Sequence, residues 1–372
     1  MKIGVIGSGA MGSGIAQVAA QAGHDVLVFD QNAAALVRAR HSLKSTLAKL
    51  TEKGKISTEE SERIFACVTF HESLDALAPC ALVIEAIVEN LDVKKSVFKA
   101  LEQLVSDTCI LATNTSSLSV TAIASACSNP SRFLGIHFFN PAPLMPLVEI
   151  IPALQTDNQL TEHCAELIRS WGKVPVICKD TPGFIVNRVA RPFYSEALRI
   201  LDEGIADMAT IDQAMRNLGF RMGPFELMDM IGHDVNYTVT ESVFSAMYFD
   251  PRFRPSITQK KLVEAGWLGR KAGRGFYSYA EGISVPQPSA DEALLRSIGS
   301  RVLAMLINEA YDTVYYGIAS AESVDLAMTK GVNYPKGLIA WGRELGIEHV
   351  RKSLLELYNK YNEDRYRLSP GL

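Results

Sequence analysis

KIGVIGSGAMG, residues 2–12, is an apolar β-like run that breaks into the spacing G-x-G-x-x-G, and a helical pattern follows through about residue 22. Gly7 permits a tight turn, Gly9 lets the backbone approach a pyrophosphate, and Gly12 lets the helix lie close on the strand. The helix start, where Ala10 and Met11 stand, presents amides without intrahelical acceptors to an anion. The stretch predicts the phosphate-binding turn of a dinucleotide domain.

The cofactor is predicted from the end of the next strand. A second β-like run, residues 25–29, ends in Asp30, where an acid can bind a ribose 2′-hydroxyl. No Arg or Lys occurs in residues 31–33 to neutralise a 2′-phosphate. NAD is therefore favoured over NADP. The alternative is a glycine-rich turn that binds nothing.

Length and composition limit the class of protein. At 372 residues the chain is expected to form two or three domains, because single cores stop growing at about 250–300 residues. The formal net charge of -4 gives no basic excess for nucleic acid or anionic lipid. The N-terminus enters directly into a strand and no long apolar run follows, which predicts a cytoplasmic protein without a membrane segment. The six cysteines include no C-x-x-C pair, so neither a metal site nor a disulfide framework is expected.

The chain up to residue 183 reads as an α/β domain. Two helices, ending near residue 54 and opening at residue 57, form an excursion whose lysines either face solvent or, at Lys49 and Lys53, contact an anionic substrate. Apolar strands resume at residues 67–70, 81–86, 110–112 and 147–151. They deliver polar side chains to the edge of the sheet where such folds bind ligands. These side chains are Glu89, Lys94, Asn114 and Ser116.

A domain boundary is predicted at the breaker KDTPG, residues 179–183, because strands dominate before it and helices after it. A long helix is expected from residue 184 to about residue 203. The fold class is therefore α/β, a Rossmann dinucleotide-binding domain followed by an all-α part.

Four residues form the candidate catalytic group. His137 can exchange a hydroxyl proton, and Glu149 on the neighbouring strand can orient its imidazole. Ser116 and Asn187 can hydrogen-bond a substrate oxygen on which negative charge develops. The structural alternatives are a core histidine, a helix cap for Ser116 and a turn bond for Asn187.

The motifs together resemble the L-3-hydroxyacyl-CoA dehydrogenase family. The resemblance covers about residues 1–280 through GSGAMGSGIAQ at Gly7, VIEAIVEN at Val83, NTSSLS at Asn114, GIHFFNPAPLMPLVEI at Gly135, TPGFIVNR at Thr181, RMGPFELMDMIG at Arg221 and GWLGRKAGRGFYSY at Gly266. It implies reversible NAD-dependent oxidation of a (3S)-3-hydroxyacyl-CoA thioester to the 3-oxoacyl-CoA. The family's catalytic positions fall on His137, Glu149, Ser116 and Asn187, of which Ser116 and Asn187 also bind substrate. Its cofactor positions fall on Asp30, Glu89, Lys94, Asn140 and Lys271, and Ser116 is shared between the cofactor and thioester sites. Asn114, beside Ser116, is a further candidate for binding the cofactor.

The segment after residue 280 is an imperfect repeat of the helical domain. Residues 302–346 match residues 189–232, and Arg252-Phe253-Arg254 recurs as Arg365-Tyr366-Arg367. The domains are thus predicted at 1–183, 184–280 and 291–372, with a linker at 281–290 and a non-catalytic second copy. Single-copy members of the family dimerise through this domain, so the two copies are expected to pack within one chain, with a homodimer left open. The VNYPKG and EDRYR phrases resemble the second copy in 3-hydroxyadipyl-CoA dehydrogenases of phenylacetate breakdown.

Two other readings stay open at this point. A 3-hydroxy acid dehydrogenase of the 6-phosphogluconate type would use a helix lysine, but the helix opening carries Asn187 and no lysine before residue 200. A non-catalytic, crystallin-like NAD binder would be expected to lose the four catalytic positions, which are all present.

Overall fold

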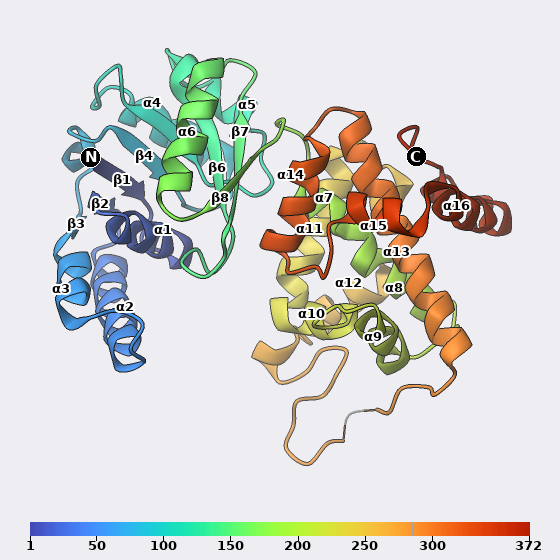
Figure 1. Ribbon diagram of the computed structural model, residues 1–372. Helices are drawn as coiled ribbons and strands as arrows, with labels where there is room; N and C mark the ends of the chain where they lie inside the picture. Colours follow the sequence, from blue (N-terminus) through green and yellow to red (C-terminus); the bar gives the residue numbers. More distant parts are fainter. Residues whose placement is uncertain (285) are drawn as a thin grey trace. The chain divides into compact units, whose positions relative to one another are not determined.

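The computed structural model describes residues 1–284 and 286–372, and residue 285, in the predicted linker, lies outside the described residues. The chain divides into two compact units, residues 1–181 and 182–372. Figure 1 shows strands and helices in the first unit and helices in the second. The fold class expected from the sequence is confirmed, whereas the residue-level domain limits stay predictions.

The first unit is built on an eight-stranded sheet in the order β3-β2-β1-β4-β5-β6-β7-β8. The strands are β1 Lys2–Ile6, β2 Asp25–Phe29, β3 Val68–His71, β4 Leu82–Glu85, β5 Ile110–Thr113, β6 Phe133–Phe138, β7 Leu147–Pro152 and β8 Val174–Ile177. All neighbours are parallel except β6 and β7. Because β2 and β4 lie on opposite sides of β1, the order reverses there, which is where open α/β sheets bind ligands.

The helices of this unit are α1 Ala10–Gln21, α2 Ala33–Glu52, α3 Thr58–Ala66, α4 Leu91–Leu101, α5 Val120–Ala124 and α6 Asn158–Ser170. The expected excursion is formed by α2 and α3, which lie side by side away from the strands (Figure 1). Leu36, Ala39, Leu43 and Leu47 form the buried face of α2. Its opposite face is left for polar side chains.

The second unit is helical throughout its described residues, apart from short 3-10 turns and isolated bridges. Its helices are α7 Val186–Val189, α8 Arg191–Asp202, α9 Met208–Asn217, α10 Pro224–Ile231, α11 His233–Ala246, α12 Ile257–Glu264, α13 Glu292–Tyr315, α14 Ala321–Leu326, α15 Leu338–Leu345 and α16 Ile347–Tyr361. The single helix expected over residues 184–203 was wrong, because it breaks at Ala190 into α7 and α8. Pro192 explains the break, since proline has no N–H to donate and clashes with the carbonyl four residues before it.

The internal repeat is visible in the capping of its helices. Asp212 accepts the N–H groups of Phe225 and Glu226 at 2.9 and 3.2 Å, which caps α10. Asp325 caps α15 in the same way through the N–H groups of residues 339 and 340, at 2.7 and 3.1 Å. The second copy has one more residue between the aspartate and its helix. A π-helical turn, Ala327–Gly331, absorbs that residue without losing the cap.

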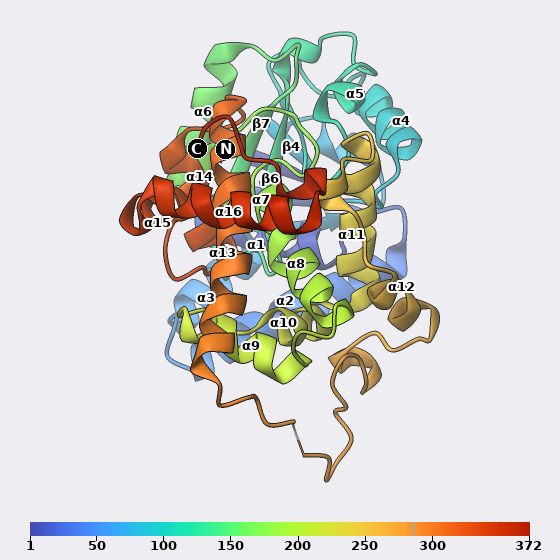
Figure 2. The same ribbon diagram turned by 90° about the vertical axis from the view of Figure 1, so that its right-hand side faces the viewer.

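The two copies pack against one another inside the second unit. Helix α13 lies against α8 and α9 of the first copy, and Figure 2 shows α13 and α8 side by side. The apolar residues along one side of α13 are expected to supply the contact between the copies. All of them are buried except Val314, which is partly exposed; the buried ones are Val302, Leu303, Leu306, Ile307 and Ala310.

Candidate active site

The glycine turn has the geometry that a bound phosphate requires. Gly7 has φ +101°, and a Cβ there would lie 2.6 Å from the carbonyl oxygen of Ala86. A Cβ on Gly12 would lie 1.9 Å from the oxygen of Gly7, so the helix can approach the strand only without a side chain. Nothing lies within 4 Å of a Cβ built on Gly9, the N-cap of α1. The start of α1 therefore opens on space, with its amides available to an anion.

Asp30 is held beside this turn at the end of β2. Its carboxylate accepts the N–H and Oγ–H of Ser8 at 2.9 and 2.8 Å and the N–H of Asn32 at 3.0 Å. Partial burial opposes ionisation, but these hydrogen bonds outweigh it and hold the pKa of Asp30 below its ordinary value. An ionised acceptor thus stands where a ribose hydroxyl is expected.

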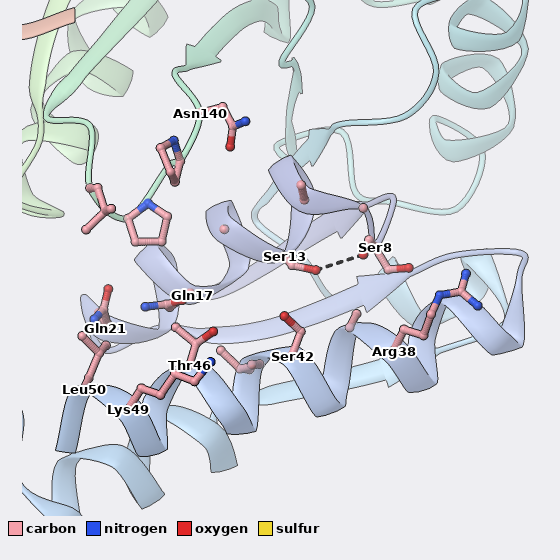
Figure 3. Close-up of a pocket in the computed structure, with 18 of the residues that line it drawn as sticks. Ser8, Ser13, Gln17, Gln21, Arg38, Ser42, Thr46, Lys49, Leu50 and Asn140 are labelled. Atoms are coloured by element: carbon pink, nitrogen blue, oxygen red, sulfur yellow. Dashed lines mark hydrogen bonds between the residues drawn. The ribbon is translucent and has the colours of Figure 1, made fainter. Parts of the chain in front are cut away.

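A cavity of about 750 Å³ joins the turn to α2 (Figure 3). One wall carries Ser8, Gly9, Ala10, Ser13 and Gln17, and the loop after β6 contributes Asn140, Pro141, Pro143 and Leu144. The facing wall is formed by α2 and its C-cap, with polar residues Arg38, Ser42, Thr46, Lys49 and Lys53 and apolar residues Ala35, Ala39, Leu43 and Leu50. Lys49 and Lys53, singled out from the sequence, line this cavity, whereas Lys44 and Lys55 are not among its lining residues.

Arg38 was missed by the sequence reasoning, which searched only residues 31–33 for a cation. Its charge acts on Asp30, and it stands on the cavity wall. The helical spacing of Arg38, Ser42, Thr46 and Lys49 was the signal that could have placed it on one face with the two lysines.

Three of the polar residues predicted at the sheet edge meet after β4 and β5. Glu89 accepts the Oγ–H of Thr115 at 2.5 Å and the backbone N–H groups of Ser116 and Ser117 at 3.0 and 3.2 Å. Lys94 lies 3.2 Å from Glu89 and is 1% exposed. Burial of Glu89 opposes its charge, but Lys94 and these hydrogen bonds keep its pKa below its ordinary value. Glu89 therefore shapes the turn that carries Ser116.

Glu85 is the innermost, fully buried residue of this hydrogen-bond network, and it was not predicted from the sequence. It accepts from Lys94 Nζ at 2.5 Å and from Thr113 Oγ1 at 2.7 Å, with no exposed area. Asn114, the next residue after β5, accepts the N–H of Phe138 at 2.8 Å, which ties the ends of β5 and β6 together. A buried acid at the end of an apolar strand was the sequence signal for Glu85.

His137 and Glu149 are brought together by strand register. They are directly opposite in the antiparallel β6–β7 pair, and the imidazole Nδ1 lies 2.7 Å from Glu149 Oε2. Both side chains are buried. The expected dyad thus exists as a contact between neighbouring strands.

The loop that follows His137 is anchored by Lys173. Its ammonium donates to the carbonyl oxygens of Ala142, Pro143 and Met145 at 2.6, 3.4 and 2.8 Å. Burial lowers the pKa of Lys173. Asn140, on the same loop, lines the cavity (Figure 3).

Two predicted site residues belong to the second unit. Asn187 lies in α7, after Gly183 and Phe184, which have φ of +77° and +48°. Lys271 donates to both carboxylate oxygens of Asp234 at 2.6 and 2.7 Å. Their roles toward cofactor and substrate stay predictions.

Among the described residues, no cluster of histidine, cysteine and acidic side chains is suited to hold a metal ion. The six cysteines are free thiols, five of them buried. None of the described helices is long and apolar enough to cross a bilayer.

A parallel sheet with a glycine turn, an acid after its second strand and a buried histidine–carboxylate pair defines the class of nicotinamide-dependent dehydrogenases. The comparisons with known proteins narrow this class. The chain belongs to the 3-hydroxyacyl-CoA dehydrogenase family: residues 2–181 match its NAD binding domain, and residues 183–279 and 298–372 each match its C-terminal domain. The expected NAD-binding domain and the duplication of the helical domain are thereby confirmed.

The relatives include proteins that match nearly the whole of this chain and shorter proteins that match about three quarters of it. A 3-hydroxyadipyl-CoA dehydrogenase of Escherichia coli K12 is 40% identical over 98% of this chain and 95% of its own. A 3-hydroxybutyryl-CoA dehydrogenase of Bradyrhizobium diazoefficiens is 42% identical over 77% of this chain and 97% of its own. The crystal structure of a 3-hydroxybutyryl-CoA dehydrogenase from Escherichia coli K12 superimposes with a TM-score of 0.94 at 38% identity, covering 100% of this chain and 97% of that one.

Proposed function

We propose that this protein catalyses the reversible, NAD-dependent oxidation of (3S)-3-hydroxyacyl-CoA thioesters to 3-oxoacyl-CoA. The observation that carries the proposal is the buried His137–Glu149 contact at 2.7 Å, in a domain that also holds the glycine turn and Asp30. An alcohol oxidation requires a group that removes the hydroxyl proton while hydride leaves carbon, and this pair supplies it. Family membership supports the CoA thioester as the substrate class.

In the proposed mechanism the Nδ1–H of His137 donates to Glu149, so the proton from the substrate hydroxyl is received at Nε2. The Glu149 carboxylate then stabilises the imidazolium. In the reverse direction His137 returns this proton to the C3 oxygen. NAD, when bound, supplies the hydride acceptor. Ser116 and Asn187 are assigned hydrogen bonds to substrate oxygens, where charge develops.

The residues present fit an NAD molecule on the first unit. The open start of α1 at Gly9, Ala10 and Met11 suits the pyrophosphate, and ionised Asp30 suits the adenosine ribose. Glu89, Asn114 and Asn140 of this unit, and Lys271 of the second unit, are proposed as further cofactor contacts. Because Lys94 is buried between two carboxylates, its proposed part is to hold Glu89 in place.

The CoA handle is proposed to lie along the polar face of α2. Lys49 and Lys53 line the cavity and can pair with phosphates, and Arg38 adds a third cation that also acts on Asp30. We propose no nucleic-acid or membrane partner. We place the enzyme in the cytoplasm, where free thiols such as its six cysteines persist.

Acyl-chain preference is the second part of the proposal. Full-length relatives include proteins named for 3-hydroxyadipyl-CoA and for 3-hydroxybutyryl-CoA, and both substrates belong in the test. The alignment with the former runs over 451 positions, more than the 372 residues of this chain, so that relative carries inserted residues.

The test is oxidation of NADH in the presence of acetoacetyl-CoA, followed by a panel of 3-oxoacyl-CoA thioesters from C4 to C10 that includes 3-oxoadipyl-CoA. We expect robust turnover with at least one thioester and none with the free 3-oxo acids. Binding of NADH without turnover of any thioester would overturn the proposal and support a non-catalytic NAD binder.

A further inference from the structure

The two copies of the helical domain exchange equivalent ion pairs. Arg188 of the first copy donates through Nε to Glu309 of the second at 2.5 Å. Arg301, which holds the same place in the second copy, donates through Nε to Glu196 of the first at 2.6 Å. Both glutamates have no exposed area. The same arginine–glutamate contact therefore occurs twice between the copies, once in each direction, as in an isologous interface between two subunits.

The Arg188 side of this pair is the more completely buried one, because none of its charged side chains is more than 8% exposed, whereas Glu203 beside Arg301 is 22% exposed. Arg188 also donates through Nη2 to Asp312 at 3.0 Å. Arg252 shares both acids, at 3.0 Å to Glu309 and 3.1 Å to Asp312, and is 1% exposed. Two cations and two carboxylates thus form a closed buried cluster. Removing one member would leave an uncompensated charge inside the protein.

Arg188 and Arg301 differ in the residue that precedes each of them and in the length of the helix that carries them. Arg301 follows Ser300 in the middle of α13, a helix of 24 residues. Arg188 follows Asn187 in α7, which has four residues and follows two left-handed residues, Gly183 and Phe184. A single turn cannot maintain its own structure, because helix nucleation is unfavourable. The place of α7 is therefore set by what its side chains contact.

We infer that the second copy takes part in catalysis through Glu309 and Asp312. These are positioning residues: they hold the Arg188 guanidinium, and through it the backbone of α7 and the amide of Asn187. The inference rests on the proposed function, because it uses the role assigned to Asn187. It gives the duplicated domain a part in turnover beyond covering an apolar face.

The test compares Glu309→Gln with Glu196→Gln in the full-length protein. Both changes remove a buried charge from an arginine of the opposite copy without changing side-chain size, so both are expected to lower the melting temperature. Only Glu309→Gln is expected to lower kcat for acetoacetyl-CoA reduction, by about 10- to 100-fold with KM little changed, because a small displacement of a catalytic group has effects of this size. Equal kcat values in the two variants would overturn the inference.

A double-mutant cycle with Asn187→Ala tests whether Glu309 affects kcat through Asn187. If Glu309 acts through Asn187, Glu309→Gln should cost little further activity in the Asn187→Ala background. Losses that multiply would show that Glu309 acts elsewhere and would refute the inference. An inactive parent would instead refute the proposed function.

Asp312→Asn replaces Glu309→Gln if circular dichroism shows that the latter is unfolded. It keeps the Glu309 contact and loses one ion pair to each arginine. A reduced kcat relative to Glu196→Gln supports the inference, and an unchanged kcat contradicts it.

Discussion

The chemistry of His137 depends on a single position of strand register. Its partner Glu149 is opposite it across β6 and β7, so a shift of either strand by one residue would turn one side chain to the other face of the sheet. Burial of both groups excludes water as a competing acceptor for Nδ1–H. The ring is therefore held in one orientation by the backbone as well as by the carboxylate.

Replacement of this pair should affect turnover rather than cofactor binding. His137→Gln is expected to lower kcat by about 10²- to 10⁴-fold, the usual contribution of a positioned proton-transfer group. Glu149→Gln should cost less, because the amide oxygen can still accept from Nδ1–H but carries no charge to stabilise an imidazolium. Stopped-flow turnover and NADH fluorescence titration measure the two effects. A base elsewhere in the protein is indicated if either variant turns over like the parent.

Asp30 should determine which dinucleotide is used. Since its pKa is below its ordinary value, the carboxylate is ionised throughout the neutral range and repels a 2′-phosphate. Asp30→Ala is expected to weaken NADH binding and to reduce the preference for NADH over NADPH, with Arg38 then free of its nearby opposing charge. The ratio of kcat/KM for the two cofactors is the measurement. Equal ratios in parent and variant would contradict this assignment.

At the scale of helices and strands, the sequence pattern predicted those elements whose formation depends mainly on neighbouring residues. The apolar runs at β4 and β5 identified buried strands, and the glycine spacing identified the turn before α1. The break at Ala190 was missed because a single Pro192 outweighs an otherwise helical pattern. Lys173 was missed because it acts on a loop that lies about 30 residues earlier in the chain, and no local spacing reports such a contact. Arg38 and Glu85 act on residues eight and nine positions away, and the helical spacing and the buried strand end that indicate them were not used.

Helices α8 and α16 are joined by an acid that makes the interface between the copies sensitive to low pH. Glu203, at the end of α8, accepts from Tyr361 at 2.6 Å and from Arg301 at 3.0 Å. Burial opposes its charge, but hydrogen bonds from Arg301, Tyr361 and Arg199 lower its pKa from 4.5 to about 2. Because the pKa is depressed in the folded state, the stabilisation is present above about pH 4.5 and is lost as the pH falls toward 2.

Urea denaturation at pH 7, 4 and 3 tests this linkage. Glu203→Gln is expected to be less stable than the parent at pH 7, and this difference should shrink as the pH falls through the window. A difference between parent and variant that is the same at all three values would show that Glu203 is not the titrating group.

At the scale of the whole molecule, the second copy provides the first with both apolar contact and countercharge. Ile298, Val302, Leu306 and Ile307 of α13 are at most 2% exposed. Arg188 and Arg252 would lose both of their carboxylates if α13 were removed. A single-copy chain must therefore find a substitute for α13 or leave two cations and an apolar face in water.

A protein ending at residue 284 is expected to find that substitute in a second molecule of itself. Glu196 holds the place in the first copy that Glu309 holds in the second, so two truncated chains can pair Arg188 of each with Glu196 of the other in an isologous dimer. We expect sedimentation to show a dimer for residues 1–284, and aggregation or monomers after Glu196→Ala in that background, while the same substitution leaves the full-length chain in its original association state. A truncated protein that stays monomeric, soluble and as heat-stable as the full chain would show that the second copy does not cover this face.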